Sequence, residues 1–278
     1  MIGKGTSYGA ITVINAMPCG IGSTIGVSLR TSAVFTLAGD TKNVGISNDP
    51  SEDKEMAKIC VSETYKKIGV EEPKGWGLKI SSDIPISRGL KSSSSACNAI
   101  VSSVLDSERA DMDVIERIRL GVNCARMAKV TVTGSFDDAC GCGLGGHVIT
   151  DNRSDTILFH GDIDEYDVVL YVPREKIRKT GLPLDRLKSI SSEIEKLIGI
   201  AKTDPFKAMT MNGKLIASVS GLDNSISDIA MESGALGAGV SGSGPAVAIV
   251  LEKGDTEDFI RRSGLIGLKT TITRRKQI

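Results

Sequence analysis

The stretch from Asp83 to Ile100 reads Asp-Ile-Pro-Ile-Ser-Arg-Gly-Leu-Lys-Ser-Ser-Ser-Ser-Ala-Cys-Asn-Ala-Ile. Pro85 is expected to end a strand, and Gly89 permits a backbone turn that a Cβ atom would hinder. The serines from Ser92 to Ser95 then open a helix, because serine is a favoured residue at a helix start. The stretch is therefore predicted to be a loop of small residues that leads into a helix N-terminus.

Such a helix start predicts a site for anions. Free backbone N–H groups point out of a helix N-terminus, and the helix dipole adds about half a positive charge there. The hydroxyl groups of Ser92, Ser93 and Ser94 can reach phosphate oxygens or a Mg²⁺ ion, and Lys91 can add a mobile positive charge. Because one serine would suffice as a cap, the run of serines favours a phosphate loop over a simple helix cap.

This loop differs from the usual P-loop. That pattern needs a glycine directly before the lysine and another glycine five residues earlier. Here Leu90 precedes Lys91. The stretch therefore indicates another family of phosphate loops.

A second stretch, Val132-Thr-Gly-Ser-Phe-Asp-Asp-Ala, places Asp137 and Asp138 between a glycine turn and a run of small residues. A carboxylate held there by nearby backbone and partly desolvated could orient or deprotonate a substrate hydroxyl. The alternative interpretation is an acidic turn that caps a helix beginning near Ala139.

A third stretch, Leu236-Gly-Ala-Gly-Val-Ser-Gly-Ser-Gly-Pro-Ala-Val, contains Gly237, Gly239 and Gly242 in a G-x-G-x-x-G pattern. A dinucleotide-binding fold is not expected, because that fingerprint follows a strand and opens a helix. Here a helix-like segment precedes the glycines, and the strand-like residues 246–251 follow Pro245. The predicted order is helix, Gly/Ser loop and strand, which brings loop backbone close to the site. A plain tight turn is the alternative.

The composition of the 278 residues limits the class of protein. Lys+Arg and Asp+Glu both number 34, so the chain lacks the excess of basic residues that is typical of nucleic-acid-binding proteins. The basic run 274–276 is expected to be a solvated tail. Six cysteines and two histidines show no metal-binding spacing, so no zinc site is expected. No signal peptide or membrane-length apolar run is visible, which predicts a cytoplasmic protein with reduced thiols and no membrane partner.

The apolar patterns alternate between strands and helices without a steady βαβ rhythm, which predicts an α+β fold with two layers. The strands are expected at residues 10–14, 27–37, 75–80, 166–172 and 247–251, with a loop at 18–26. Helices are expected at residues 51–68, from 92 onward, at 111–127, and around 184–198 and 215–219. Asp113 with Glu116 predicts a capping box at the start of the third.

Taken in order, the three stretches resemble the motifs of the GHMP kinase superfamily, which includes galactokinase, homoserine kinase, mevalonate kinase and phosphomevalonate kinase. Pro85 to Ala96 is similar to P-x-x-x-G-L-x-S-S-A, and Ser241 to Pro245 is similar to S-G-x-G-P. Gly134 to Asp138 is similar to the catalytic segment G-x-x-D-N of the family. Within the superfamily, residues 133–139, 5–16 and 87–94 resemble the archaeal-type shikimate kinases.

The resemblance implies a two-domain fold: a ribosomal protein S5 domain 2-like domain at residues 1–155 and a ferredoxin-like domain at 156–278, with the active site between them. It implies transfer of the γ-phosphoryl group of ATP to the 3-hydroxyl of shikimate, in the biosynthesis of chorismate and aromatic amino acids. Another small-molecule kinase, with homoserine kinase nearest, is the alternative. A ligand-sensing protein without catalysis is a third hypothesis, and the oligomeric state stays open.

Site residues are also implied by the resemblance. Asp137 would be the catalytic carboxylate that faces the acceptor hydroxyl, and Ser93 would bind Mg²⁺ together with ATP. The residues implied to wrap the ATP phosphates are Pro85, Ile86, Ser87, Arg88, Gly89, Leu90, Lys91, Ser92, Ser93, Ser94 and Ser95. The residues implied to approach from the C-terminal domain are Gly239, Ser241, Gly242, Ser243 and Gly244.

The chain also departs from the family pattern. Arg126 stands where several relatives have a metal-binding Glu, eleven residues before the catalytic Asp, so Asp138 or water is expected to replace that ligand. Ala10 and Ala16 stand where several relatives carry Lys and Glu in their first motif. A lysine from that motif is therefore not expected here.

Overall fold

The computed structural model describes residues 1–47, 49–174 and 182–274, so the last two residues of the basic run at 274–276 lie outside the described part. Within it, the first sheet has six strands in the order β3-β4-β2-β5-β6, with β1 paired to β2. These strands are β1 (Ile2–Ile14), β2 (Ile21–Leu37), β3 (Lys42–Ile46), β4 (Trp76–Ser82), β5 (His147–Asp151) and β6 (Thr156–Gly161).

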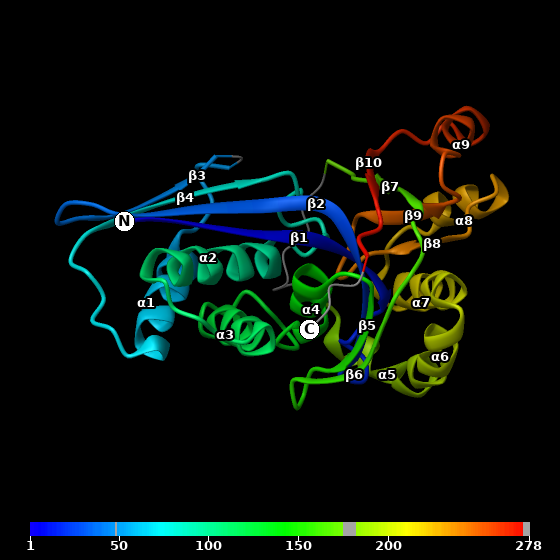
Figure 1. Cartoon of the computed structure of the whole chain (residues 1–278). Coiled ribbons are helices and arrows are strands. Elements are labelled where there is room, and N and C mark those ends of the chain that lie inside the picture. Colours follow the sequence, from blue (N-terminus) through cyan, green and yellow to red (C-terminus); the bar gives the residue numbers. More distant parts are fainter. Residues whose placement is uncertain (48, 175–181, 275–278) are drawn as a thin grey trace.

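The two long strands β1 and β2 run antiparallel through the first domain (Figure 1). Strand β2 also pairs with β4 along residues 31–37 and with β5 along residues 21–25. The two strands predicted at 10–14 and 27–37 are confirmed, but both begin earlier than expected. The loop expected at 18–26 is correspondingly shorter, because β2 already begins at Ile21.

Four helices of the first domain lie together on one side of these strands (Figure 1). They are α1 (Glu55–Ile68), α2 (Ser92–Glu108), α3 (Val114–Met127) and α4 (Phe136–Leu144). Helix α2 lies directly on β1: a Cβ atom added at Gly3 would be 2.0 Å from the carbonyl oxygen of Ser103, and one at Gly5 would be 2.0 Å from that of Ala99. The glycines of β1 therefore let α2 approach closely, which fixes the position of its N-terminus.

The starts of these helices agree only in part with the sequence predictions. The Asp113 half of the predicted capping box is confirmed, since its Oδ1 accepts from the N–H groups of Ile115 (2.8 Å) and Glu116 (3.2 Å). Helix α1 begins at Glu55 rather than at residue 51. The helix expected to begin near Ala139 begins at Phe136, so both acids of the second motif lie in its first turn.

The second sheet has the order β10-β7-β9-β8, with β7 (Asp167–Tyr171), β8 (Gly237–Val240), β9 (Val247–Leu251) and β10 (Leu268–Thr271). Side chains alternate between its faces along β7: Val168 and Leu170 join a core that includes β1 and β2, and Val169 joins a core that includes Phe259. The largest core therefore ties the second sheet to the long strands of the first.

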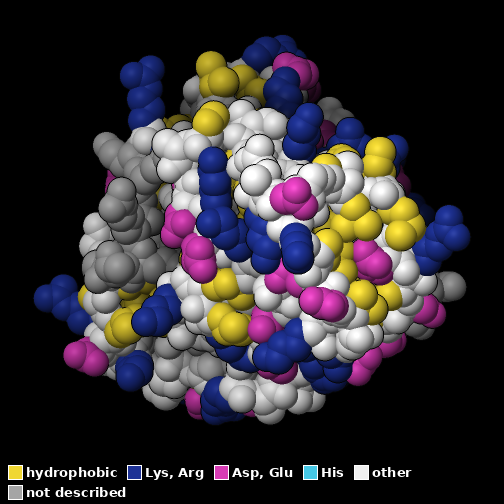
Figure 2. All heavy atoms as spheres, turned by 90° about the vertical axis from the view of Figure 1, so that its left-hand side faces the viewer, with side chains coloured by type: hydrophobic (Ala, Val, Ile, Leu, Met, Phe, Trp, Pro, Cys, Tyr) yellow, Lys and Arg dark blue, Asp and Glu magenta, His cyan; other side chains and the backbone are white. Residues whose placement is uncertain are grey.

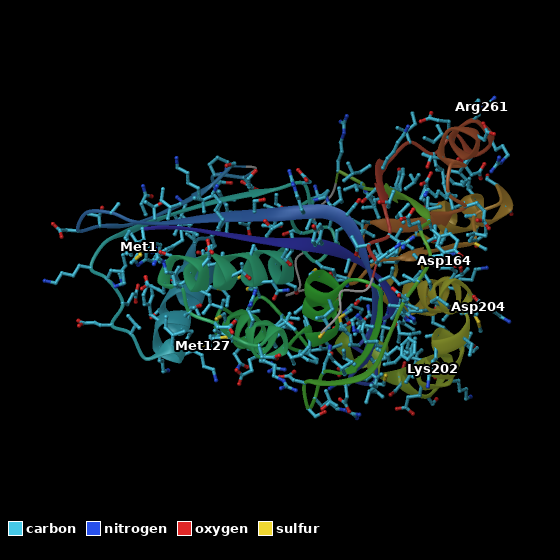
Figure 3. The ribbon with its side chains drawn as sticks, in the orientation of Figure 1. Met1, Met127, Asp164, Lys202, Asp204 and Arg261 are labelled. Atoms are coloured by element: carbon cyan, nitrogen blue, oxygen red, sulfur yellow. The ribbon has the colours of Figure 1, made fainter. Side chains whose placement is uncertain are left out.

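Helices cover both faces of the second sheet. The face toward the first domain packs with α6 (Ser191–Thr203) and α7 (Pro205–Ser220), which follow α5 (Leu184–Ser189). Figure 3 labels Lys202 and Asp204 at the corner between α6 and α7. The other face packs with α8 (Ser225–Glu232) and α9 (Thr256–Ser263). The arrangement confirms the predicted α+β fold with two domains.

Strand β6 follows the predicted division at residue 155 but still pairs with β5, so the chain changes sheets between Gly161 and Asp167. The division at 155 itself stays a prediction. The order expected for the third motif is confirmed in part: α8 precedes the glycines and β9 follows Pro245, but Gly237 and Gly239 lie in a further strand, β8, which forms a hairpin with β9. A Cβ atom at Gly239 would be 2.6 Å from the carbonyl oxygen of Met209, which explains the small residue there.

All six cysteines are buried and unpaired with one another in disulfides. In the described ranges, no helix combines the length and apolar character that crossing a bilayer requires. On the face shown in Figure 2, Lys and Arg side chains are intermixed with Asp and Glu.

Candidate active site

A cleft of about 590 Å³ lies where the two domains meet. Its walls come from the end of β1, from residues 85–95 (the predicted phosphate loop), from the turn before α4 with the first turn of α4, and from the turn 241–245 between β8 and β9 (the Gly/Ser hairpin turn). The predicted site residues that line it are Ser87, Gly89, Lys91, Ser92, Ser93, Ser94, Asp137, Gly242 and Ser243. The three sequence motifs therefore meet in one place.

The other predicted residues lie around this cleft rather than in its lining. Pro85, Ile86 and Arg88 line a neighbouring pocket at the surface. Leu90 and Ser95 are buried at 2% and 0% exposure. The rest belong to the β8–β9 hairpin: Gly239, Ser241 and Gly244.

Helix α2 presents an uncapped N-terminus to the cleft. Lys91 takes the N-cap position in the left-handed conformation (φ 67°), and no side chain caps the helix. The first intrahelical hydrogen bond runs from Ser95 N to the Lys91 carbonyl oxygen (3.0 Å). The N–H groups of Ser92, Ser93 and Ser94 therefore precede the bonded part of the helix and can bind an anion.

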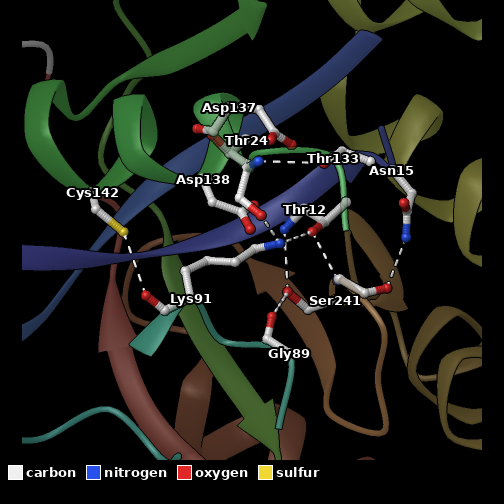
Figure 4. Close-up of polar contacts among 12 residues, drawn as sticks. Thr12, Asn15, Thr24, Gly89, Lys91, Thr133, Asp137, Asp138, Cys142 and Ser241 are labelled. Carbon is white, nitrogen blue, oxygen red and sulfur yellow. Dashed lines mark hydrogen bonds and ion pairs between the residues drawn. The ribbon is translucent and has the colours of Figure 1, made fainter. Parts of the chain in front are cut away.

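Lys91 is fixed in place. Its Nζ lies 2.7 Å from Asp138 Oδ1 and donates to Thr12 Oγ1 at 2.7 Å (Figure 4). The expectation of a mobile charge is therefore wrong, because the side chain is only 5% exposed and bound at both partners. Burial opposes a charge on Lys91, but attraction by Asp138 and Asp137 outweighs it and raises the pKa of Lys91. A stable positive charge therefore stands between the two acids and the phosphate loop.

The turn of the β8–β9 hairpin closes over the phosphate loop. Ser241 Oγ donates to the Gly89 carbonyl oxygen (3.0 Å), and Gly242 N donates to Thr12 Oγ1 (2.8 Å). Asn15 Nδ2 donates to the Gly242 carbonyl oxygen (2.8 Å). Gly89 has φ +81°, and a Cβ atom there would be 2.0 Å from the Ser241 carbonyl oxygen. These contacts, several of them drawn in Figure 4, join both domains at the cleft.

Asp137 is the buried acid of the cleft, with 4% exposure. Asn152 Nδ2 donates to Asp137 Oδ1 (2.7 Å), and Thr24 Oγ1 donates to the Asp137 carbonyl oxygen (2.8 Å). The other carboxylate oxygen lies over Gly22, where a Cβ atom would be only 2.2 Å from Oδ2. A side chain larger than hydrogen at Gly22 would therefore displace this acid.

The surroundings of Asp137 suit a general base. Burial and the neighbouring Asp138 raise its pKa to about 7, although Lys91 and Asn152 act in the opposite direction. A base whose pKa lies near the working pH combines a useful ionised fraction with a useful driving force for proton transfer.

Arg126 does not enter the cleft. Its Nη1 and Nη2 donate to the two carboxylate oxygens of Asp155, each at 2.7 Å, and Nη2 also lies 3.3 Å from the Asn152 carbonyl oxygen. In the part of the chain that the structure describes, no three His, Cys, Asp or Glu side chains form a metal cage. Arg126, which stands where several relatives have a metal-binding Glu, therefore forms a structural ion pair with Asp155.

A smaller apolar slot of about 100 Å³ opens beside the phosphate loop. Met56, Ile80 and Ala96 contribute to its walls, and it shares Ser92 and Ser93 with the large cleft. This slot has no local sequence signature, because its walls include residues of β2, β3, β4, α1 and α2. Thr12 and Asn152 were also missed: Asn152 lies outside the quoted motifs, and nothing local marks Thr12 within residues 5–16 as a partner of Lys91.

Comparison with known proteins agrees with this geometry. Residues 55–146 match the model of the GHMP kinases N terminal domain, and residues 207–264 match that of the GHMP kinases C terminal domain. The chain belongs to the GHMP kinase family. Members of this family are ATP-dependent phosphotransferases, and the predicted resemblance is confirmed.

Individual relatives of this GHMP kinase are similar over most of its length. The shikimate kinase of Methanocella arvoryzae is 36% identical, with 95% of this chain and 90% of the relative covered. That of Methanobrevibacter smithii is 34% identical, with 91% and 89% covered. Mevalonate kinase of Methanococcus jannaschii shares the fold with a TM-score of 0.80 at 17% identity, covering 100% of this chain and 98% of that one.

Proposed function

We infer that this GHMP kinase is a shikimate kinase, which transfers the γ-phosphoryl group of ATP to the 3-hydroxyl of shikimate and releases shikimate 3-phosphate and ADP. Similarity to archaeal shikimate kinases over more than nine-tenths of the chain supports the choice of acceptor. The observation that carries the chemistry is one cleft in which the uncapped start of α2 and the buried carboxylate of Asp137 meet.

The donor half of the reaction uses the start of α2. The amides of Ser92, Ser93 and Ser94 would bind the phosphates of ATP, because they are free donors at the positive end of a helix dipole. The adjoining apolar slot would hold the flat base, since nucleotide sites combine apolar walls with a few polar groups. Lys91 would neutralise charge that develops during phosphoryl transfer.

The residues present fit a Mg²⁺ ion that arrives with ATP. Such an ion is usually held by substrate phosphates, several waters and one or two protein oxygens. Ser93 Oγ lies in the cleft lining and would supply one, whereas Asp138 is already paired with Lys91, which favours water for the remaining positions. When bound, Mg²⁺ would supply charge neutralisation at the transferred phosphoryl group.

The acceptor half uses Asp137. Its carboxylate would take the proton of the acceptor hydroxyl as that oxygen bonds to the γ-phosphorus, and the bond from the γ-phosphorus to the bridging oxygen breaks to release ADP. Homoserine is the second candidate acceptor, because homoserine kinase from Cytophaga hutchinsonii shares the fold at a TM-score of 0.74. We place the reaction in the cytoplasm, where both ATP and reduced thiols occur.

The test is a panel of acceptors. The purified protein is incubated with Mg-ATP and with shikimate, homoserine, mevalonate or galactose, and ADP release and product mass are measured. We expect turnover with shikimate at least about tenfold above the other acceptors, since sites that hydrogen-bond a hydroxyl strongly reject analogues that lack it. Turnover of another acceptor without shikimate would overturn the assignment, and ATP binding without any turnover would favour the non-catalytic ligand sensor.

A further inference from the structure

Asn152 lies one residue after β5 and is 3% exposed. Its side chain uses every hydrogen-bonding position that an asparagine has. Nδ2 donates to Asp137 Oδ1 (2.7 Å) and to Thr133 Oγ1 (3.3 Å), and Oδ1 accepts from Asp137 N (3.0 Å) and from Thr150 Oγ1 (2.7 Å). The same side chain therefore holds Asp137 at both its backbone and its carboxylate.

The backbone of Asn152 is held as well. Its N–H donates to the Gly20 carbonyl oxygen (2.9 Å), and its carbonyl oxygen lies 3.3 Å from Nη2 of Arg126, which is fixed by Asp155. A buried donor that is braced in this way cannot turn with the carboxylate. Because Gly22 lies directly against Asp137 Oδ2, the carboxylate is held from two sides.

We propose that Asn152 is a positioning residue, which holds the carboxylate of Asp137 in the one orientation that receives the proton of the acceptor. This inference rests on the proposed function of the cleft and assigns to it a residue outside the three sequence motifs. A side chain with only a structural role would tie α4 to β5 without affecting proton transfer.

The electrostatic consequence separates these two roles. The charged groups that face Asp137 are Asp138 on the same helix and Lys91 from the phosphate loop, and Thr24 of β2 is a neutral neighbour. Burial and Asp138 raise the pKa of Asp137, whereas Lys91 and the amide of Asn152 lower it. Loss of the amide donor therefore raises this pKa further, and a larger share of the enzyme is protonated at neutral pH.

Asn98 offers a matched control. It is also a buried asparagine, at 4% exposure, and its Nδ2 donates to the Ala139 carbonyl oxygen of the same helix (2.9 Å). Asn98→Ala therefore removes one amide anchor of α4 without removing the donor to Asp137. Asn152→Asp is a second test variant, since it keeps the shape of the side chain and both acceptor contacts of Oδ1 but replaces the donor with an oxygen.

The experiment compares full-length wild type, Asn152→Ala, Asn152→Asp and Asn98→Ala. One readout is the dependence of kcat/KM on pH for the acceptor that the wild type phosphorylates. The other is the ¹³C chemical shift of the Asp137 carboxyl carbon against pH. Wild-type kcat/KM should rise with pH through an apparent pKa near 7, as the carboxylate ionises. Asn152→Ala should move the acid limb and the carboxyl titration upward by about one to two pH units, the scale of one lost hydrogen bond to a charged group. Asn152→Asp should move them further upward, because it also places a second carboxylate beside Asp137.

The Asn98→Ala variant should lower thermal stability but leave both titrations in place. Equal shifts in Asn98→Ala and Asn152→Ala, or an unmoved carboxyl titration in both Asn152 variants, would overturn the positioning role. Because the carboxyl titration needs no turnover, it decides the role of Asn152 even if no acceptor is phosphorylated. A protein that phosphorylates no acceptor would count against the proposed function alone.

Discussion

Helices α2 and α4 begin in the same way but present opposite charges to the cleft. Each has its N-cap residue in the left-handed conformation, Lys91 at φ 67° and Ser135 at φ 53°, and neither N-cap side chain bonds to its own helix start. The first turn of α2 holds no acid, whereas that of α4 holds Asp137 and Asp138. The same backbone geometry therefore leaves one helix start open for an outside anion and gives the other its own carboxylates.

This difference assigns the two substrates to two walls of the cleft. An ATP triphosphate is attracted by the free amides of α2 and repelled by the acids of α4. The acceptor is neutral at its hydroxyl and meets the acid instead. Lys91 connects the two helix starts, because it is the N-cap of α2 and pairs with Asp138 of α4.

The largest effect is expected at the acid of α4. Asp137→Asn keeps the shape and the bond to Asn152, but it removes the base. We expect kcat to fall by roughly 10² to 10⁴-fold, the usual contribution of a general base, with ATP affinity largely unchanged. Steady-state kinetics and calorimetric titration with ATP check this, and an unchanged kcat would remove Asp137 from the mechanism.

The link between the two helix starts is the next test. Lys91→Met leaves the buried Oδ1 of Asp138 without its cation, so we expect unfolding free energy to fall by about 3–5 kcal/mol. We also expect ATP to bind roughly tenfold more weakly, as for one lost charge-assisted contact. The double variant Lys91→Met/Asp138→Asn should regain most of the stability but not the affinity. Recovery of both would show that Lys91 serves only the fold.

Placing an acid at the open helix start should make α2 resemble α4. Ser92→Asp puts a carboxylate in the first turn, which favours the helix by about 0.3–1 kcal/mol but repels phosphate. We therefore expect thermal stability to stay level or rise while the Kd for ATP increases by about tenfold or more. Ser92→Ala is the control for the lost hydroxyl. Equal ATP affinity in Ser92→Asp and wild type would place the phosphates elsewhere.

The smallest effect on function is expected at a helix start that is already capped. Asp113 caps α3 outside the cleft. Asp113→Ala should cost about 1 kcal/mol of stability, as measured for other caps, and should leave the Kd for ATP unchanged. Urea unfolding and ATP titration measure the two quantities. A change in ATP affinity in Asp113→Ala would mean that the presence or absence of a cap does not distinguish helix starts that only stabilise the fold from those that bind phosphate.

The sequence allowed the start of α2 to be predicted because its evidence is local. Gly89 and the serines stand next to one another, so the loop and the helix start need no knowledge of the rest of the fold. The fixed position of the Lys91 side chain could not be predicted locally, because its partners Thr12 and Asp138 are 79 and 47 positions away. The expectation of a mobile lysine failed for that reason.

Other differences have the same physical origin. The first part of β1 was missed because glycines disfavour strands, yet Gly3 and Gly5 are needed for the close approach of α2. Strand β8 was missed because Gly237 and Gly239 pack against α7. In each case a tertiary contact outweighed the local preference of the residue.

The most direct test of the account is a titration of the full-length protein with Mg²⁺ and a non-hydrolysable ATP analogue, followed by the amide resonances of α2 and α3. Binding of the triphosphate at the open helix start predicts large shifts of the Ser92, Ser93 and Ser94 amides and little change at Ile115 and Glu116, which Asp113 already caps. Saturable binding that leaves the three serine amides unmoved would contradict the central claim.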